Sequence, residues 1–388
     1  MSRENLILKI AWMLVVVLLF GPISVYSKEP VTLKIWSLNW PEPIEQWNIL
    51  SKDLEKIGIQ VEIKTGPLSE WVGEIIGTKN PYHVVTMTWS GSPERMEASW
   101  FLSEFFHSNR AKPGGRNYGY YVNPEYDKTM DAQLVEVNAD KRKQLIWKAQ
   151  ELIDKDNAFF PIYFKDMVQA YNSDRLEGVI PTIGSGIGFP YLPWTFYKAK
   201  PKTNVREPRI VNMHDPISVN PFAGSAEPQT MGWLKLVYDP LAIRDVDTDI
   251  IPWAAESWKN VDNKTVDIVL RKGMKFHDGK PVTVEDVKFT FDYILKWKFP
   301  PLSQVWRNIE SVQTMDDRRI RIKMPTPYSA FTANVLTNVF IVPKHIWEKI
   351  PESVGVANPM DWPNTAMPII GSGAFQIVEW KKQEYLHQ

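Results

Sequence analysis

Apolar residues in the segment 31–58 change from one regular spacing to another, and this change restricts the fold more than any other feature. In VTLKIW, which starts at Val31, they occupy every second position, as is typical of a strand with one apolar face. They then recur at spacings of three and four, at Ile44, Trp47, Leu50, Leu54 and Ile57. That spacing places them on one face of a helix. Gly58 stands where the C-terminal cap of this helix belongs.

The same succession continues up to residue 89. IQVEIK alternates as a second strand over 59–64, a short helix is expected over 69–76, and HVVTMTW predicts a third strand over 83–89. A βαβαβ order predicts a parallel sheet with helices on its faces. The fold class is therefore predicted to be α/β.

Two helical patterns and a change of composition follow. PEYDKTMDAQLVEV and ADKRKQLIWKAQELIDKD predict two helices within 123–156, and AFFPIYF (158–164) predicts a buried strand. Residues 178–206 are rich in Gly and Pro and end in the polar KAKPKTNVREP. We therefore predict a domain boundary here, with one domain over 28–205 and another over 206–388. RIVNM, TVDIVL and RIRIKM predict strands in the second domain.

The first 27 residues read as a cleavable signal peptide. A short charged start is followed by the apolar run IAWMLVVVLLF and by GPISVYS, with the small residues Val25 and Ser27 before Lys28. The run is shorter than the roughly 20 apolar residues that span a bilayer. The alternative is an uncleaved N-terminal anchor. The chain has no cysteine, so disulfides and a lipid anchor are excluded, and a periplasmic location is expected.

Charge gives no reason to expect nucleic acid or an anionic membrane as a partner. Lys plus Arg and Asp plus Glu both number 45, so the formal net charge is zero. The sequence contains no basic stripe and no run of like charges.

The segment KFHDGKPVTVEDVKFTFDYIL gathers His277, Asp278, Glu285 and Asp286 and could be an acid–base cluster or a metal site. A structural explanation is favoured. Asp-Gly is a strong turn signal, Thr283 and Asp286 resemble a capping box, and acidic residues suit the first turn of a helix.

Other catalytic patterns are missing from the sequence. It has no HExxH and no GxSxG, and GSGIG is not a dinucleotide-binding fingerprint. No catalytic residue, metal or cofactor is therefore expected.

Longer segments carry a family resemblance. PWAAESWKNVDNKTVDIVLRKGMKFHDGKPVTVEDVKFTFDYIL resembles the signature region of extracytoplasmic solute-binding proteins of ABC importers, in the oligopeptide, dipeptide and nickel group (family 5). LVYDPL, MPTPYSAF, IVPKHIWE and IIGSGAFQIVEW are similar to the same family. So are LSKDLEKIGIQVEIK, NYGYYVNPEYDKTMD and RKQLIWKAQELIDKDNAFFPIYF in the first half. Together these segments span nearly all of residues 31–388.

The order of these segments differs from that of the family. The part like 207–380 comes first in the family and the part like 31–200 comes last, and the family's middle stretch has no counterpart here. The chain is thus expected to be a circular permutant or a rearranged gene product, with its first lobe incomplete. Permutation is physically plausible because the termini of a domain often lie close together at its surface.

The resemblance implies a two-lobed α/β protein of the type II periplasmic-binding class. Such a protein captures an oligopeptide-class solute between its lobes and delivers it to a membrane permease. It is expected to act as a monomer and to need no cofactor. Two alternatives are an oligosaccharide-binding member, which the 17 tryptophans favour, and an exported glycosidase with paired carboxylates. A third is a non-functional rearranged fragment.

Trp89 is the leading candidate for the ligand site. It ends a predicted parallel strand, where ligands bind in open α/β sheets, and it matches a family tryptophan that lines the pocket. Peptide-binding members carry an aspartate three residues later to pair with the peptide amine, and Ser92 stands there instead. Glu94 is a possible substitute. The other candidates are Trp36, Trp40, Asn117, Tyr118, Tyr120, Asn220 and Tyr238.

Overall fold

The computed structural model describes residues 31–76, 82–87, 93–164, 166, 168–184, 186–188, 192–202, 216–224 and 228–387. The chain divides into one unit up to Met87 and a second from Thr88 onward. The predicted boundary near residue 205 stays a prediction. The predicted signal peptide and the predicted strand RIVNM lie outside the described residues.

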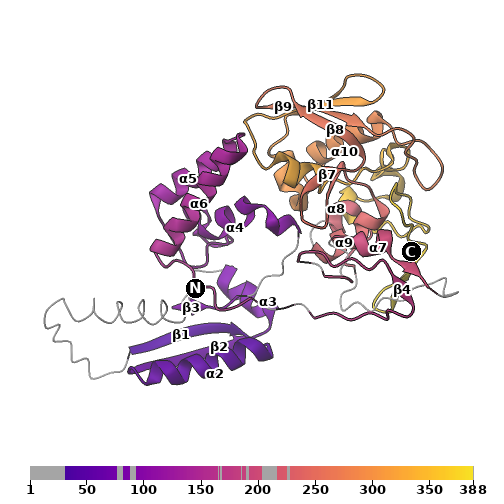
Figure 1. Ribbon diagram of the computed structural model, residues 1–388. Coiled ribbons are helices and arrows are strands. Elements are labelled where there is room, and N and C mark those ends of the chain that lie inside the picture. The colour runs from indigo at the N-terminus through magenta and orange to yellow at the C-terminus, as the bar shows by residue number, and fades with distance from the viewer. Residues whose placement is uncertain are drawn as a thin grey trace. The chain divides into compact units, whose positions relative to one another are not determined.

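The first unit is a parallel sheet in the order β2-β1-β3, as the alternating spacings predict (Figure 1). Of the third strand predicted over 83–89, only Val84–Val85 is formed among the described residues. Its elements are β1 (Val31–Leu38), α2 (Pro41–Glu55), β2 (Ile59–Gly66), α3 (Leu68–Trp71), the π-helical turn Val72–Ile76 and β3 (Val84–Val85). β1 pairs in parallel with both neighbours. The predicted cap is displaced by two residues: Lys56 is the C-cap of α2, and Gly58 follows it with a φ of +81°. The α/β class is thus confirmed.

A small helical layer begins the second unit. It contains α4 (Ala98–Phe106), α5 (Pro124–Val135) and α6 (Ala139–Lys155), and the last two confirm the helices predicted within 123–156. Asn123 and Asn138 cap α5 and α6 by accepting hydrogen bonds from backbone N–H groups of the first turn. The apolar faces of the three helices meet in one cluster around Tyr126 and Met130.

The prediction of a buried strand over 158–164 is wrong. The segment forms no strand, and every residue from Phe159 to Phe164 is exposed, with Phe160 at 82% and Phe164 at 93%. Its composition suits a strand that is apolar on both faces, but such a strand is stable only when it is paired on a sheet. The sheets in the described part of the chain do not include it.

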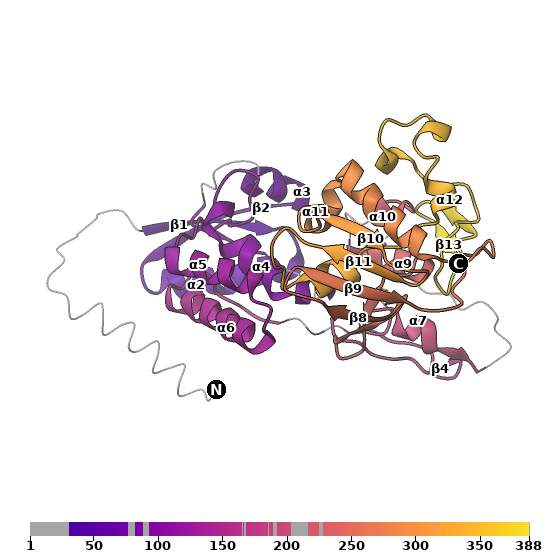
Figure 2. The ribbon, with the colours of Figure 1, turned by 90° about the horizontal axis from the view of Figure 1, so that it is seen from above.

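The rest of the second unit is built on an antiparallel sheet in the order β10-β11-β9-β8. Its strands are β8 (Ala255–Asn260), β9 (Thr265–Leu270), β10 (Ser311–Thr314) and β11 (Arg319–Lys323). The strands predicted for TVDIVL and RIRIKM are therefore confirmed. Helix α10 (Val284–Trp297) lies beside this sheet (Figure 2), and its apolar face belongs to the same large core.

Shorter elements surround this core. The helices are α7 (Trp194–Lys198), α8 (Pro221–Gly224), α9 (Pro228–Val237), α11 (Ser303–Trp306) and α12 (Lys344–Trp347). The paired strands are β4 (Leu176–Glu177) with β5 (Lys200–Pro201), β6 (Ala242–Arg244) with β7 (Ile250–Pro252), and β12 (Glu379–Lys381) with β13 (Tyr385–His387).

Candidate functional site

His277 serves the fold. Gly371 donates its N–H to Nδ1 at 3.1 Å, and Nε2 lies 2.9 Å from the Gly373 carbonyl oxygen. Through these contacts the ring fastens the IIGSGAF segment to the turn that contains Gly279, whose φ is +85°. Gly373 has to be glycine, because a Cβ there would lie 2.3 Å from the Leu236 carbonyl oxygen.

Asp286 likewise has a structural role. Its Oδ2 accepts hydrogen bonds from the backbone N–H of Thr283 at 2.9 Å and from the Thr283 hydroxyl at 2.7 Å. Its Oδ1 accepts the N–H of Lys344 at 3.0 Å. The carboxylate thus caps α10 and attaches it to α12, as the capping-box pattern predicts. Within the described ranges, no group of three or more histidine or acidic side chains could hold a metal ion.

Polar side chains gather around Glu74 in the first unit, and two of them, Trp36 and Lys64, pair in register near the carboxyl ends of β1 and β2. Glu74 Oε2 accepts hydrogen bonds from Trp36 Nε1 at 2.9 Å and from the Tyr82 hydroxyl at 3.0 Å. The Lys64 ammonium donates to Glu74 and lies 3.0 Å from Glu70 Oε1. This edge is where ligands bind in open parallel sheets.

The charges in this cluster stabilise each other. The hydrogen bond from Lys64, followed by the one from Trp36, holds the pKa of Glu74 below its ordinary value. The hydrogen bond to Glu74, followed by the one to Glu70, raises the pKa of Lys64. At neutral pH the cluster therefore holds one ammonium between two carboxylates.

The predicted tryptophan sites differ in accessibility. Trp36 is fully buried, whereas Trp40, just after β1, is 40% exposed and has a surface available for stacking. Trp89 and Ser92 lie outside the described residues, as does the Glu94 side chain. All of these stay predictions as ligand contacts.

The predicted loop residues Asn117, Tyr118 and Tyr120 lie between α4 and α5. Asn117 is buried, and its amide accepts the N–H of Tyr121 at 2.9 Å and donates to the Tyr121 carbonyl at 2.8 Å. Tyr118 is buried with its ring edge-on to Phe105, and Tyr120 is partly exposed with a φ of +51°. The structure brings these three together in one loop, and their role in binding stays a prediction.

Asn220 and Tyr238 belong to the core of the second unit. Asn220 Nδ2 donates to the carbonyls of Pro359 at 2.8 Å and Trp362 at 2.7 Å. The Tyr238 hydroxyl accepts a hydrogen bond from Asn364 Nδ2 at 3.2 Å. Both side chains are fully buried, so a contact with solute would require this packing to open.

A cleft of about 530 Å³ lies within the second unit, between the α5–α6 hairpin and the β-sheet. This volume is within the range of small-molecule sites, roughly 300–1,000 Å³. Residues 136–146 supply one wall, the β8–β9 turn supplies another, and residues 324–332 supply a third. The walls are joined where Ser329 donates its N–H to the Leu134 carbonyl and its hydroxyl to the Gln133 carbonyl.

Groups of both charge signs line this cleft. Arg142 and Lys143 come from α6, Glu136 precedes it, and Asp262 lies in the β8–β9 turn. Arg142 is fixed by an ion pair with Glu97 and by donating from Nε to Gln133 Oε1 at 3.1 Å. Hydrogen bonds from the backbone of Lys264 and the side chain of Thr265 hold the pKa of Asp262 low. These charges could receive the two termini of a zwitterionic solute.

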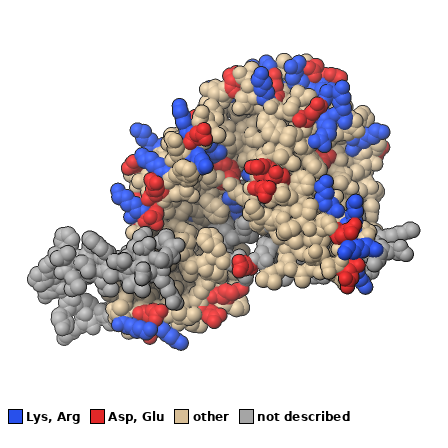
Figure 3. Space-filling model, in the orientation of Figure 1, with Lys and Arg blue, Asp and Glu red and all other residues tan. Residues whose placement is uncertain are grey.

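Apolar and hydroxyl groups complete the cleft lining. Val137, Ile146 and Phe331 give apolar contact, and Tyr328 adds a hydroxyl. Burial raises the pKa of Tyr328 to about 12, so its hydroxyl remains protonated at neutral pH. On the face of the molecule shown in Figure 3, side chains of both charge signs are interspersed.

Comparison with known proteins finds relatives over part of the chain. Residues 249–387 match the family described as bacterial extracellular solute-binding proteins, family 5 Middle. The oligopeptide-binding protein AppA of Bacillus subtilis is 31% identical over 154 residues, which are 39% of this chain and 28% of AppA. A probable ABC transporter-binding protein of Deinococcus radiodurans is 27% identical, over 45% of this chain and 31% of its own. The chain thus spans about three tenths of these relatives.

Solved structures give the same partial match. A periplasmic oligopeptide-binding protein of Thermotoga maritima is 32% identical, with a TM-score of 0.38, over 43% of this chain and 30% of that one. A structure of it with mannohexaose bound gives 31% identity and a TM-score of 0.36, over 42% and 29%. AppA of Bacillus subtilis in complex with a nonapeptide is 27% identical, with a TM-score of 0.39, over 45% of this chain and 34% of AppA.

Proposed function

We propose that the chain captures an oligopeptide-class solute for an ABC importer, because residues 249–387 match family 5 of the bacterial extracellular solute-binding proteins. The family match is the observation that carries the proposal. In this role the chain works outside the cytoplasm, passes its solute to a membrane permease and performs no catalysis. The match includes the β8–β9 turn and residues 324–332, which form two walls of the cleft.

We place the solute in this cleft because its charges suit a short peptide. Lys143 is exposed at the rim and is the cation best placed to meet a solute carboxylate, since Arg142 is already paired with Glu97. Asp262 carries the opposite charge on the facing wall and suits a peptide amine. The apolar side chains between them contact the solute's own apolar groups.

An oligosaccharide is the second candidate solute. The relative from Thermotoga maritima has been solved with mannohexaose bound, and this chain contains 17 tryptophans. Trp40 and the predicted site residue Trp89 are the tryptophans that would stack on sugar rings in this case.

A thermal melt of the purified chain against short peptides and mannose oligomers tests the proposal. A ligand at 100 times its dissociation constant stabilises a protein by about 2.7 kcal/mol. For units of this size the melting temperature should then rise by about 5–10 °C. A melting temperature that no peptide or oligosaccharide changes would contradict the proposed function.

A matched pair of variants locates the solute. Lys143→Met should weaken peptide binding about fivefold, which corresponds to an exposed ion pair of about 1 kcal/mol. Lys141→Met changes the same charge on the same helix outside the cleft lining and should leave affinity unchanged. Equal effects of the two substitutions would place the solute elsewhere.

A further inference from the structure

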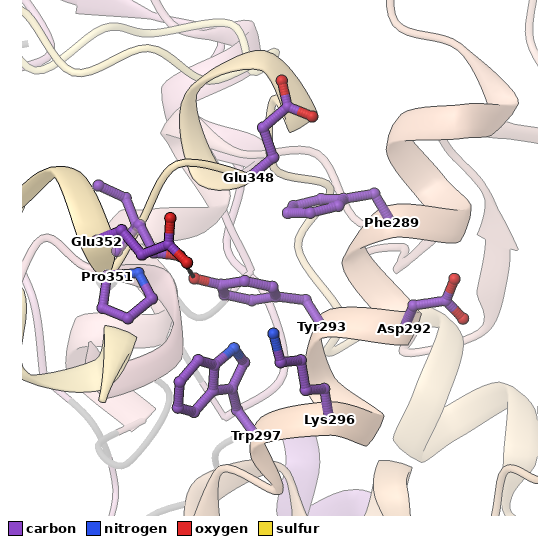
Figure 4. A pocket seen from close by; sticks show the side chains of 9 residues that line it. Phe289, Asp292, Tyr293, Lys296, Trp297, Glu348, Pro351 and Glu352 are labelled. Carbon is purple, nitrogen blue, oxygen red and sulfur yellow. Dashed lines mark hydrogen bonds between the residues drawn. The ribbon is translucent and has the colours of Figure 1, made fainter. Parts of the chain in front are cut away.

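A separate pocket of about 300 Å³ lies between α10 and the turn after α12 (Figure 4). Three aromatic residues line it from consecutive turns of the helix: Phe289, Tyr293 and Trp297. The rings of Phe289 and Tyr293 are 5.1 Å apart, and those of Tyr293 and Trp297 are 6.2 Å apart. We call these three side chains the aromatic shelf. The Tyr293 hydroxyl donates a hydrogen bond to the Ile350 carbonyl at 2.7 Å, which joins the aromatic shelf to the turn after α12.

One acidic side chain of the pocket is in an ion pair, and two are not. Asp292 is paired with Lys288 on the preceding turn of α10. Glu348 and Glu352 come from the facing turn, and both are exposed. Among the described residues, neither carboxylate accepts a hydrogen bond or forms an ion pair. Two carboxylates beside an aromatic shelf provide the chemistry that binds ammonium and guanidinium groups.

Two hydrogen-bond donors lie on the side of the Tyr293 ring that faces away from Glu348. In Figure 4 the ammonium of Lys296 and the indole nitrogen of Trp297 lie together on one side of the Tyr293 ring, with Glu348 on the opposite side. The Lys296 ammonium is 5.2 Å from the centre of the Trp297 ring and has no ion pair within the described chain. Trp297 Nε1 is buried and has no hydrogen-bond partner in the described structure. A buried donor without an acceptor is uncommon, and a bound carboxylate would satisfy it.

From this arrangement we propose that the pocket binds a free basic α-amino acid. The unpaired charges are two carboxylates, from Glu348 and Glu352, and one ammonium, from Lys296. A basic amino acid carries the complementary set of two cationic groups and one carboxylate. Its cationic groups lie between the glutamates and the aromatic shelf, and its carboxylate accepts hydrogen bonds from Lys296 and Trp297. The site is distinct from the cleft, and the proposal does not depend on the proposed function.

Calorimetric titration with L-arginine and with agmatine, which lacks the carboxylate, tests this assignment on the full chain. The double substitution E348Q/E352Q should weaken L-arginine binding about fivefold to tenfold, as expected for two exposed ion pairs. Glu310→Gln makes the same type of charge change at an exposed residue outside the pocket and should have no effect.

Lys296→Met tests whether the carboxylate of the bound amino acid lies at Lys296, because its expected effects on L-arginine and on agmatine differ. It should weaken L-arginine binding, because it removes a partner of the carboxylate. It should not weaken agmatine binding, because agmatine then meets one fewer positive charge. A variant that strengthens the binding of both ligands, or leaves L-arginine binding unchanged, would overturn the assignment of the carboxylate.

Two further outcomes would overturn the proposal as a whole. The first is an absence of saturation at about 10 mM L-arginine, which is tenfold above a millimolar dissociation constant. The second is L-arginine binding that Lys143→Met abolishes and E348Q/E352Q leaves intact, which would assign the amino acid to the cleft. A chain that binds L-arginine in this pocket but binds no peptide would contradict only the proposed function.

Discussion

The guanidinium of Arg142 lies on the carboxylate of Glu97, which is only 3% exposed, and this ion pair joins α6 to the N-terminus of α4. Glu97 also accepts hydrogen bonds from the N–H and the hydroxyl of Ser99, so it caps α4. Because Arg142 lines the cleft as well, one ion pair supports both the helical layer and a wall of the candidate site.

Arg142→Ala should lower the free energy of unfolding by about 3–5 kcal/mol, because it leaves the buried Glu97 carboxylate without its cation. Urea denaturation followed by tryptophan fluorescence measures this loss. Arg319→Ala is the matched control, since it breaks an exposed pair with Asp316 and should change stability little. Similar losses in the two variants would contradict a structural role for the Arg142–Glu97 pair.

Glu74 should titrate below the ordinary glutamate value of 4.5, because the Lys64 ammonium and the Trp36 indole N–H favour its charged form. A lowered pKa means that the cluster stabilises the fold above the unfolded-state pKa, and this contribution is lost as the pH falls through the folded-state pKa. The indole N–H resonance of Trp36 reports the change by NMR. Lys64→Met should raise the pH at which Glu74 is half protonated. A half-protonation pH at or above 4.5 in the unsubstituted chain would contradict the assigned interactions.

Asp286→Ala should destabilise the second unit by about 1–2 kcal/mol, as expected for the loss of a helix cap. The loss includes the hydrogen bond to the Lys344 N–H, which Asn at this position could still accept. Thermal unfolding of D286A and D286N should therefore give a larger decrease for alanine. Solute binding in the cleft should be unaffected in both, and a variant that folds normally but loses binding would restore a functional role for Asp286.

Local sequence patterns predicted the elements whose partners are close in the chain. The strands and helix of 31–66 and the cap of α10 depend on spacing and on residues three positions apart, so the sequence contains the necessary information. The cleft depends on contact between Ser329 and the α5–α6 hairpin, nearly two hundred residues earlier, and no local periodicity encodes such a contact. Arg142 and Lys143 therefore had no local signal to separate them from other exposed charges of α6.

The segment 158–164 also shows that local patterns do not reveal distant partners, and here the result is an element that was predicted but is not formed. Its periodicity indicates two apolar faces, but periodicity cannot show whether a neighbouring strand is present to pair with it. Phe164→Ser should consequently leave the free energy of unfolding nearly unchanged, because the ring is 93% exposed and loses no packing. Phe291→Ser, at a fully buried position in α10, should cost about 3–5 kcal/mol by the loss of a core aromatic side chain. Chemical denaturation of the two variants makes this comparison directly. Comparable losses would show that Phe164 is buried in the folded protein, and the strand predicted from the sequence would then form.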